Sequence, residues 1–123
     1  MVKPALELEF GKITFTEKCM IAELNEGILF DIENNRQLLK IGTEHFQGKP
    51  YGYISYRKNS YAVNPMIYIE SANANNLKAI AVVTTDPMCI QNTKLEKQFY
   101  REKNPFEVFG TLEEAFNWVN LYI

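Results

Sequence analysis

The segment 77–86, Leu-Lys-Ala-Ile-Ala-Val-Val-Thr-Thr-Asp, constrains the fold of this chain more than any other stretch. After its lysine come five consecutive apolar residues, without the alternation of a half-buried strand. A strand of this kind must be covered on both faces, which predicts a position in the middle of a sheet with helices packed on it. Ala79 and Ala81 share one face, where small side chains permit close approach, and Ile80 and Val82 fill the other face.

The length of 123 residues fits one domain, 1–123, with a sizeable core. A net charge of −2 gives no reason to expect nucleic acid or a membrane surface as a partner. Glu7 and Glu9 lie where a signal peptide would need an apolar run, and no stretch approaches ~18 apolar residues. We therefore expect a cytoplasmic protein without a membrane span. In that reducing compartment Cys19 and Cys89 are expected to be free thiols.

The first part of the chain predicts two strands and a helix. Residues 6–15 alternate up to Gly11 and then resume on the opposite parity, which predicts one strand with a bulge at Gly11 or two short strands. Residues 19–24 predict a second strand, antiparallel to the first. The apolar spacing after Asp31 predicts a helix over 32–46, with Asp31 as its N-cap.

The rest of the chain alternates between strand and helix. The expected elements are a strand at 51–56, a loop at 57–64, a helix from Pro65, the central strand, a helix at about 89–102, broken at Asn104, a strand at 106–109 and a final helix after the capping box Thr111–Glu114. The resulting order is β-β-α-β-α-β-α-β-α. It predicts the α/β class, with a mixed sheet of four to five strands.

Apolar spacing also predicts which residues the last three helices bury. The second helix is expected to bury Met66, Ile67, Ile69 and Ala72. The third is expected to bury Ile90, Leu95, Phe99 and Tyr100 and to expose Lys94, Glu96, Lys97, Arg101, Glu102 and Lys103. The last is expected to bury Leu112, Ala115, Phe116, Val119 and Tyr122.

Three segments and the order of elements carry a resemblance to a known family. The segments are Phe-Gly-Thr-Leu-Glu-Glu-Ala-Phe-Asn-Trp-Val (109–119), Leu-Lys-Ala-Ile-Ala-Val-Val (77–83) and Gly-Lys-Pro-Tyr-Gly-Tyr-Ile-Ser (48–55). They resemble the SpoIIAA-like group of STAS-type domains and, more narrowly, small bacterial STAS/SEC14-domain proteins. The likeness covers nearly the whole chain. It implies a four- or five-stranded mixed sheet covered by helices, and a binding or regulatory role.

The phosphorylation motif of that family does not carry over to this chain. In anti-sigma-factor antagonists the phosphorylated serine belongs to an Asp-Ser-Ser-Gly-type motif after the third strand. The corresponding stretch here, 56–65, lacks the motif, and its one serine, Ser60, is not at a matched position. The SEC14 part of the likeness implies an apolar ligand, and no lipid-binding motif accompanies it.

The loop after the third predicted strand is the candidate binding surface. That strand is expected to run parallel to the central strand, and ligands in such sheets bind at the carboxyl ends of strands. Arg57 offers a planar fork of N–H donors for a carboxylate or phosphate. The candidate ligand- or partner-binding residues are Ser55, Tyr56, Arg57, Asn59, Ser60 and Tyr61. The alternative is that these residues only hold an irregular loop together.

Other polar residues have simpler interpretations. Thr84, Thr85 and Asp86 end the central strand, where they contribute to a polar site on the same edge or cap the following helix. His45 lies late in the first helix, and no positioned partner marks it as a general base. One histidine and two distant cysteines give no metal-ligand pattern. We therefore predict no catalytic residue, no metal and no cofactor.

The sequence predicts a non-catalytic STAS-like regulatory or protein-interaction module, with an unknown protein partner or a homodimer as its assembly. The alternative is a carrier or sensor of a small apolar or amphipathic ligand, held in a pocket between sheet and helices. Eight phenylalanines and seven tyrosines support that alternative, because they can line a pocket. Packing of the core and the sheet explains the same residues.

Overall fold

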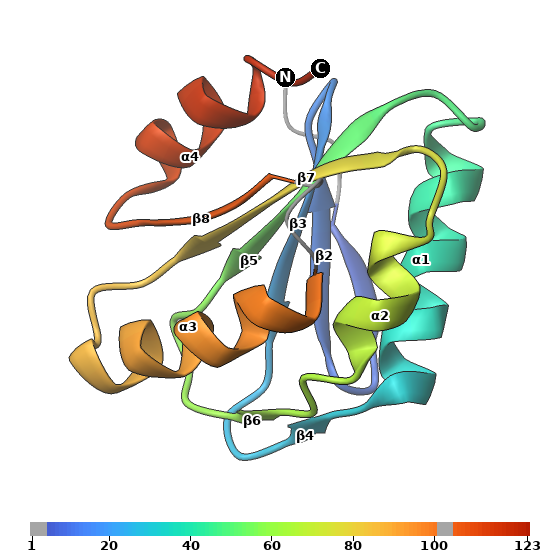
Figure 1. The fold of residues 1–123 in the computed structure, drawn as a ribbon. Helices are drawn as coiled ribbons and strands as arrows, with labels where there is room; N and C mark the ends of the chain where they lie inside the picture. Colours follow the sequence, from blue (N-terminus) through green and yellow to red (C-terminus); the bar gives the residue numbers. More distant parts are fainter. Residues whose placement is uncertain (1–4, 101–104) are drawn as a thin grey trace.

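A mixed six-stranded sheet forms the centre of the computed structural model, which describes residues 5–100 and 105–123 (Figure 1). In spatial order its strands are β1 (Leu6–Leu8), β2 (Gly11–Phe15), β3 (Cys19–Leu24), β5 (Tyr51–Tyr56), β7 (Leu77–Val83) and β8 (Phe106–Phe109). The predicted α/β class and mixed sheet are confirmed. The sheet has six strands rather than four to five, because the segment 6–15 forms two strands.

Strand directions follow the prediction. β1, β2 and β3 are antiparallel neighbours, whereas β3, β5, β7 and β8 all run parallel. A second small sheet pairs β4 (Leu29–Phe30) with β6 (Ala62–Val63) in parallel. The segment predicted as an irregular loop thus contains one short strand, which is too short to produce an alternating pattern.

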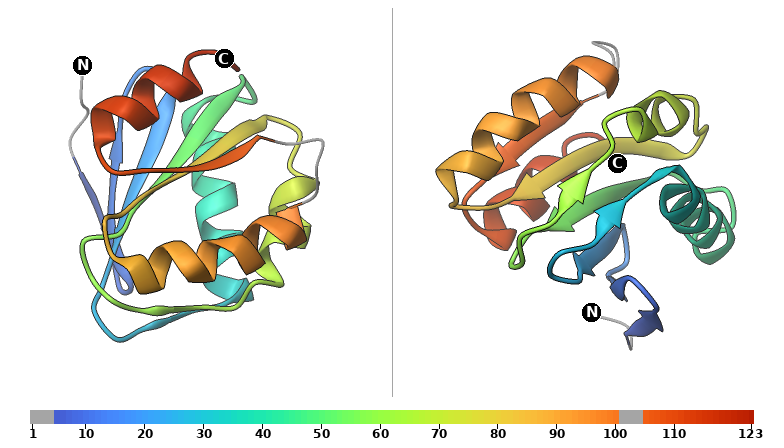
Figure 2. Two further views of the ribbon diagram at one scale, coloured as in Figure 1. Left: turned by 60° about the vertical axis from the view of Figure 1, so that its left-hand side comes forward. Right: turned by 90° about the horizontal axis from the view of Figure 1, so that it is seen from below.

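Helices cover both faces of the sheet (Figure 2). One face carries α1 (Ile32–His45), α2 (Ile67–Ala72) and α3 (Pro87–Tyr100), and the other carries α4 (Leu112–Val119). Ala79 and Ala81 of β7 pack in the cluster under α4 together with Ala115, while Ile80 and Val82 belong to the cluster on the opposite face. The division of β7 into a small face and a bulky face is therefore confirmed.

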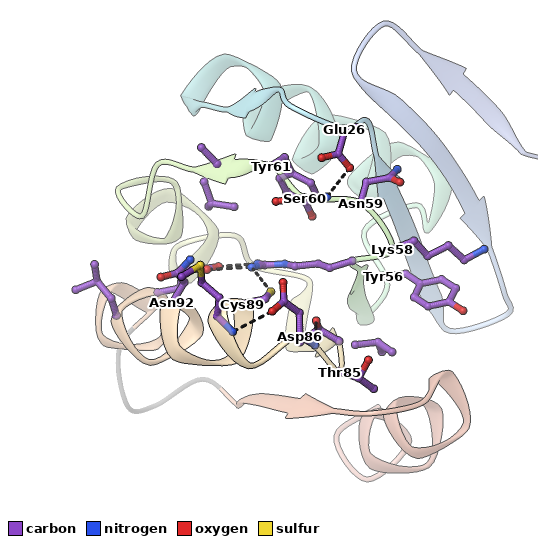
Figure 3. A pocket seen from close by; sticks show the side chains of 18 of the residues that line it. Glu26, Tyr56, Lys58, Asn59, Ser60, Tyr61, Thr85, Asp86, Cys89 and Asn92 are labelled. Carbon is purple, nitrogen blue, oxygen red and sulfur yellow. Dashed lines mark hydrogen bonds and ion pairs between the residues drawn. The ribbon is translucent and has the colours of Figure 1, made fainter.

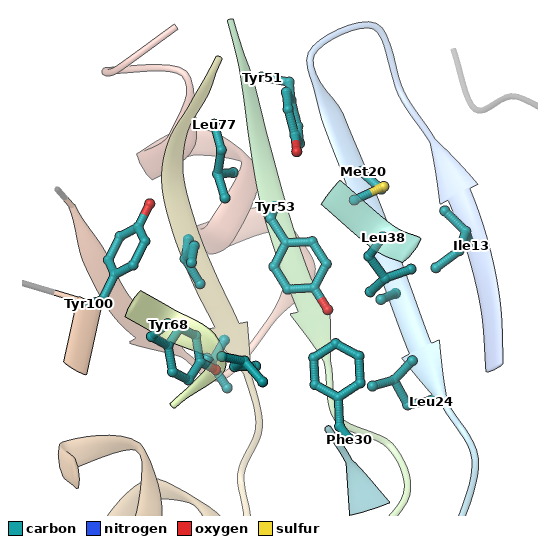
Figure 4. Close-up of a cluster of buried hydrophobic side chains, with 14 of the residues drawn as sticks. Ile13, Met20, Leu24, Phe30, Leu38, Tyr51, Tyr53, Tyr68, Leu77 and Tyr100 are labelled. Atoms are coloured by element: carbon teal, nitrogen blue, oxygen red, sulfur yellow. The ribbon is translucent and has the colours of Figure 1, made fainter. Parts of the chain in front are cut away.

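Tyrosine side chains fill much of the space under α1 and α2 (Figure 4). Tyr51, Tyr53 and Tyr68 are at most 9% exposed, and the Tyr51 ring stacks on Phe46 with centroids 4.8 Å apart. The free space left between sheet and helices at these residues is about 10 Å³, which is close to the volume that one water molecule needs. The aromatic residues of the middle of the chain thus serve packing here.

Helix starts agree with the capping residues in the sequence. Asp31 accepts a hydrogen bond from the Ile32 backbone N–H at 2.9 Å, and Asn34 Oδ1 accepts one from the Asp31 N–H. Thr111 Oγ1 accepts the N–H of Glu114 at 3.2 Å, but Glu114 Oε1 accepts from the Thr111 hydroxyl rather than from its backbone N–H, so only half of the predicted capping box forms. The predicted end of the third helix at 102 and its break at Asn104 lie outside the described residues.

The predicted buried face of α3 is wrong at Ile90 and Leu95 and in leaving Glu96 exposed, whereas Tyr100 is buried as predicted. Leu95 is 52% exposed and Ile90 37%, while the buried residues of the helix are Thr93, Glu96 and Tyr100. The helix packs against α2 and β8 and turns Glu96 toward a cationic side chain at the end of β5. Its inward face is therefore partly polar, which a count of apolar residues does not detect.

Two smaller corrections concern helix ends. Met66 precedes α2 and is 46% exposed, whereas Tyr68, which the pattern did not select, is buried at 3%. Tyr122 lies beyond the end of α4 and is 46% exposed, although Ala115 and Val119 are buried as predicted. Both errors arise because the apolar spacing was continued past the ends of short helices.

Cys19 and Cys89 are free thiols, the first buried and the second partly exposed. Within the described ranges, each helix is too short or too polar to cross a bilayer.

Candidate functional site

A cleft of about 830 Å³ opens at the carboxyl ends of β5 and β7, between the loop 57–65 and the first turns of α3 (Figure 3). Backbone hydrogen bonds fix this edge of the sheet. The Arg57 N–H donates to Val83 O at 3.0 Å, and the Thr84 N–H donates to Phe109 O at 2.9 Å. The cleft lies at the edge of a parallel sheet where ligands of α/β proteins usually bind.

The fold brings most of the predicted site residues to this cleft. Those that line it are Tyr56, Arg57, Asn59, Ser60 and Tyr61, together with Thr84, Thr85 and Asp86 at the end of β7. Ser55 does not line it: its side chain is buried behind Arg57. That these residues bind a ligand or partner stays a prediction, but they do form one surface.

The guanidinium of Arg57 is fully engaged inside the protein. Its Nη2 and Nη1 donate to the two carboxylate oxygens of Glu96 at 2.6 and 3.0 Å. Nε donates to Ser55 Oγ at 2.9 Å, Nη2 also donates to the Tyr68 hydroxyl at 3.3 Å, and Nη1 lies 3.6 Å from Cys89 Sγ. These contacts use all five N–H donors of an arginine. The carboxylate that this fork binds is therefore the protein's own Glu96.

Burial and charge act in opposite directions on this arginine. Desolvation lowers the pKa of Arg57, but the hydrogen bonds to Glu96 and the Coulombic interactions with Glu96, Tyr68 and Tyr61 together outweigh it, so the pKa lies well above its usual value. Arg57 is therefore a permanent cation. A permanent cation with a matched carboxylate is stable in a buried position only while the pair stays intact.

Two tyrosines complete the buried network. The Tyr68 hydroxyl donates to Glu96 Oε1 at 2.6 Å, and the Tyr61 hydroxyl lies 3.3 Å from Ser55 Oγ. Desolvation by burial raises the pKa of both phenols. Both hydroxyls therefore stay protonated near neutral pH, and the network joins β5, the loop 57–65, α2 and α3 at the floor of the cleft.

The loop that forms one wall is held by hydrogen bonds to the end of β3 and to the β3–β4 connection. Asn59 Nδ2 donates to Leu24 O at 2.8 Å, the Ser60 N–H donates to Glu26 Oε1 at 2.9 Å, and the Gly27 N–H donates to Ser60 O at 2.8 Å. Asn59 and Ser60 thus have structural partners as well as positions on the cleft.

Asp86 starts the other wall. Its Oδ1 accepts the Met88 N–H at 3.0 Å, and its own N–H donates to Thr84 Oγ1 at 3.2 Å. The predicted capping role of this segment is confirmed, and α3 begins at Pro87, two residues before the expected start. Because the cap lies at the edge of the sheet, Asp86 also lines the cleft.

The sequence did not select the cleft residues that α3 contributes. These are Met88, Cys89, Asn92, Leu95 and Glu96. Glu96 was predicted to face solvent, and this is wrong, since it is 4% exposed. One signal was present: an arginine directly after a buried strand needs a carboxylate partner, and α2 and α3 each contain a single one, Glu70 and Glu96.

His45 lies away from this cleft, where its ring stacks on Phe15 with centroids 3.7 Å apart. Within residues 5–100 and 105–123, no three His, Cys, Asp or Glu side chains cluster as metal ligands would.

Comparison of the chain with protein-family models, with curated proteins and with solved structures finds no match.

Proposed function

We propose that this chain is a non-catalytic regulatory module of STAS-like type that binds a small ligand in the cleft at the carboxyl ends of β5 and β7. The cleft itself carries the proposal. Its volume of about 830 Å³ falls in the range of roughly 300–1,000 Å³ that is typical of small-molecule pockets. Its position at the edge of a parallel sheet supports the same conclusion.

The rigidity of the walls also supports a binding role. The Arg57–Glu96 pair holds α3, and Asn59 and Ser60 hold the opposite loop, so a ligand would meet a largely preformed surface. A preformed site loses less conformational entropy when it binds. The polar groups on the floor are engaged with one another, which favours recognition over chemistry.

The location differs from the one that the sequence suggested for a ligand. The space between sheet and helices, with about 10 Å³ free, is filled by side chains of the core, so we place the ligand at the edge of the sheet. The STAS-like assignment rests on the resemblance of 109–119, 77–83 and 48–55 and on the mixed sheet with helices on both faces. In such a regulatory module, ligand binding would change the interaction with a protein partner or with a second copy of the chain.

A pair of neighbouring substitutions tests this function. Asn92 lines the cleft and Gln91, beside it on α3, does not, while both side chains are exposed. We expect ligand-observed NMR with a library of small organic compounds to find binders of the wild type and of Gln91→Trp that fail to bind Asn92→Trp. Equal binding to both variants, or no binder at all, would refute the proposal.

Native mass spectrometry of protein from its own host provides a second test. Extra mass that is lost under denaturing conditions would identify a retained ligand, and Asn92→Trp should lack it. A ligand-free species at twice the chain mass would instead support a dimeric interaction module.

A further inference from the structure

We propose that the ligand of the cleft is a small amphipathic amine, with its ammonium group attracted by Glu26 and Asp86 and its apolar part packed on Met88 and Leu95. This inference rests on the proposed function, because it names the chemical class of the ligand for the same cleft. It follows from the charges that remain uncompensated on the walls and from the apolar side chains exposed beside them.

Both cations of the cleft already have carboxylate partners. Arg57 is paired with Glu96, and both side chains are less than a tenth exposed. Lys58 Nζ lies 3.2 Å from Glu23 Oε1 and 4.9 Å from the centre of the Tyr56 ring. Arg57 is therefore no free anchor for an anionic ligand, because an anion would have to displace Glu96, and the charge of Lys58 is already partly balanced by Glu23.

Two carboxylates of the cleft lack such a partner. Glu26 and Asp86 lie on opposite walls of the cleft (Figure 3). Within the described part of the chain, neither of them forms an ion pair. Each uses one oxygen to accept a backbone N–H, from Ser60 and Met88 respectively. The cleft therefore has a surplus of negative charge, and a concave site with a surplus of one sign attracts the opposite charge.

The apolar half of the ligand is indicated by α3. Met88 is 74% exposed and Leu95 52%, and both line the cleft, about two turns apart on the helix. Exposed apolar side chains that lie together and are bordered by polar groups often mark a binding groove, whereas single exposed apolar residues are common on any protein surface. Val63 and Pro65 add apolar surface on the opposite wall. An ammonium group joined to a short apolar chain or ring complements both parts.

Two isosteric substitutions remove the charges without removing the hydrogen bonds. Glu26→Gln retains an oxygen for the Ser60 N–H, and Asp86→Asn retains a good N-cap for α3. The matched control is Glu7→Gln/Glu113→Gln, which changes the net charge equally at exposed positions outside the cleft. Equal thermal unfolding of the two double variants would establish that they are comparably folded.

The probes are phenylbutylamine, phenylbutanol and phenylbutyrate, which share one apolar group and differ in charge. For the wild type we expect the amine to bind most tightly by NMR titration, with a preference that falls as salt is added. The Glu26→Gln/Asp86→Asn variant should bind the amine roughly five- to tenfold more weakly, with its affinity for the alcohol unchanged. The control variant should bind like the wild type.

The failures of this inference and of the proposed function are distinguishable. If the alcohol or the carboxylate binds as tightly as the amine and Asn92→Trp still blocks it, the cleft is a ligand site but not an amine site. The same conclusion follows if removal of the two carboxylates leaves amine affinity unchanged. If no compound of any charge binds in the cleft, both proposals fail.

Discussion

The guanidinium of Arg57 and the carboxylate of Glu96 form a bidentate ion pair at the floor of the cleft, with Nη2–Oε1 at 2.6 Å and Nη1–Oε2 at 3.0 Å. Their side chains are only 7% and 6% exposed. The pair links the end of β5 to the middle of α3, and Tyr68 adds α2 through its hydroxyl. The position of α3, and therefore one wall of the cleft, depends on this contact.

Removal of the carboxylate should be strongly destabilising. We expect Glu96→Ala to lower the free energy of unfolding by about 3–5 kcal/mol, because it leaves the Arg57 cation buried without a counter-charge. Urea unfolding at neutral pH measures the change. The partly exposed Glu23, which pairs with Lys58 and Lys12, is the control, since Glu23→Ala should cost only up to about 1 kcal/mol for each of these pairs.

A double replacement separates the pair from its surroundings. Arg57→Met/Glu96→Leu removes both charges and keeps side-chain volume, so it should be more stable than either single variant. If Glu96→Ala costs less than about 1 kcal/mol, the pair is solvated and does not hold α3. Because Arg57 carries this structural role, loss of ligand binding in Arg57→Ala would not by itself identify a ligand contact.

The close approach of α4 to the sheet depends on Gly52. A Cβ at this position would overlap Cγ1 of Val119, a stiff β-branched side chain with no exposed surface. We expect Gly52→Ala to destabilise the protein by about 1–3 kcal/mol, as overpacking of a core does. In the Val119→Ala background the same substitution should cost much less. Equal costs in the two backgrounds, compared by denaturant unfolding, would contradict this packing.

Gly42 should also resist substitution, although it lies inside a helix. Gly→Ala in a helix usually stabilises by about 0.5–1 kcal/mol. Here the added Cβ would overlap the Tyr51 hydroxyl, which is buried against α1. We expect Gly42→Ala to lower the thermal midpoint rather than raise it. Tyr51→Phe should recover part of the loss, because it removes the nearest atom, and no recovery would place the conflict elsewhere.

The features predicted correctly from the sequence are those that local pattern encodes. The apolar run 79–83 specifies burial on both faces of the strand. The alternation of Ala with Ile or Val specifies which of the two faces a helix can approach most closely. Asp31 marks the start of α1 by its own hydrogen bond. The parallel pairing of β5 and β7 then places the loop 57–65 and Asp86 at one edge of the sheet.

The features missed depend on contacts between distant residues. Glu96 pairs with Arg57 across 39 positions of sequence, so its burial is invisible in the pattern of α3. Leu95 is on the exposed side for the same reason, since the ion pair and not the apolar stripe orients the helix. The paired strands β4 and β6 have two residues each, too few for periodicity.

The buried tyrosines predict a loss of stability in alkaline solution. Burial raises the pKa of Tyr51 to about 12, and it also raises the pKa values of Tyr53 and Tyr100. Below about pH 10 these phenols are protonated in both states; above it the unfolded chain releases protons that the folded protein retains. The free energy of unfolding should therefore fall from about pH 10 upward, by up to about 1.4 kcal/mol per pH unit for each tyrosine.

The variant Tyr51→Phe isolates one of these contributions. Its hydroxyl is buried and, within the described residues, has no hydrogen-bond partner, so its removal should leave stability at neutral pH unchanged or raise it by about 1 kcal/mol. Between about pH 10 and 12 the variant should lose stability less steeply than the wild type, by about 1.4 kcal/mol per pH unit. Urea unfolding at a series of alkaline pH values measures both slopes. Identical slopes would mean that Tyr51 ionises as readily in the folded protein as in the unfolded chain, which its complete burial between Gly42 and Phe46 does not allow.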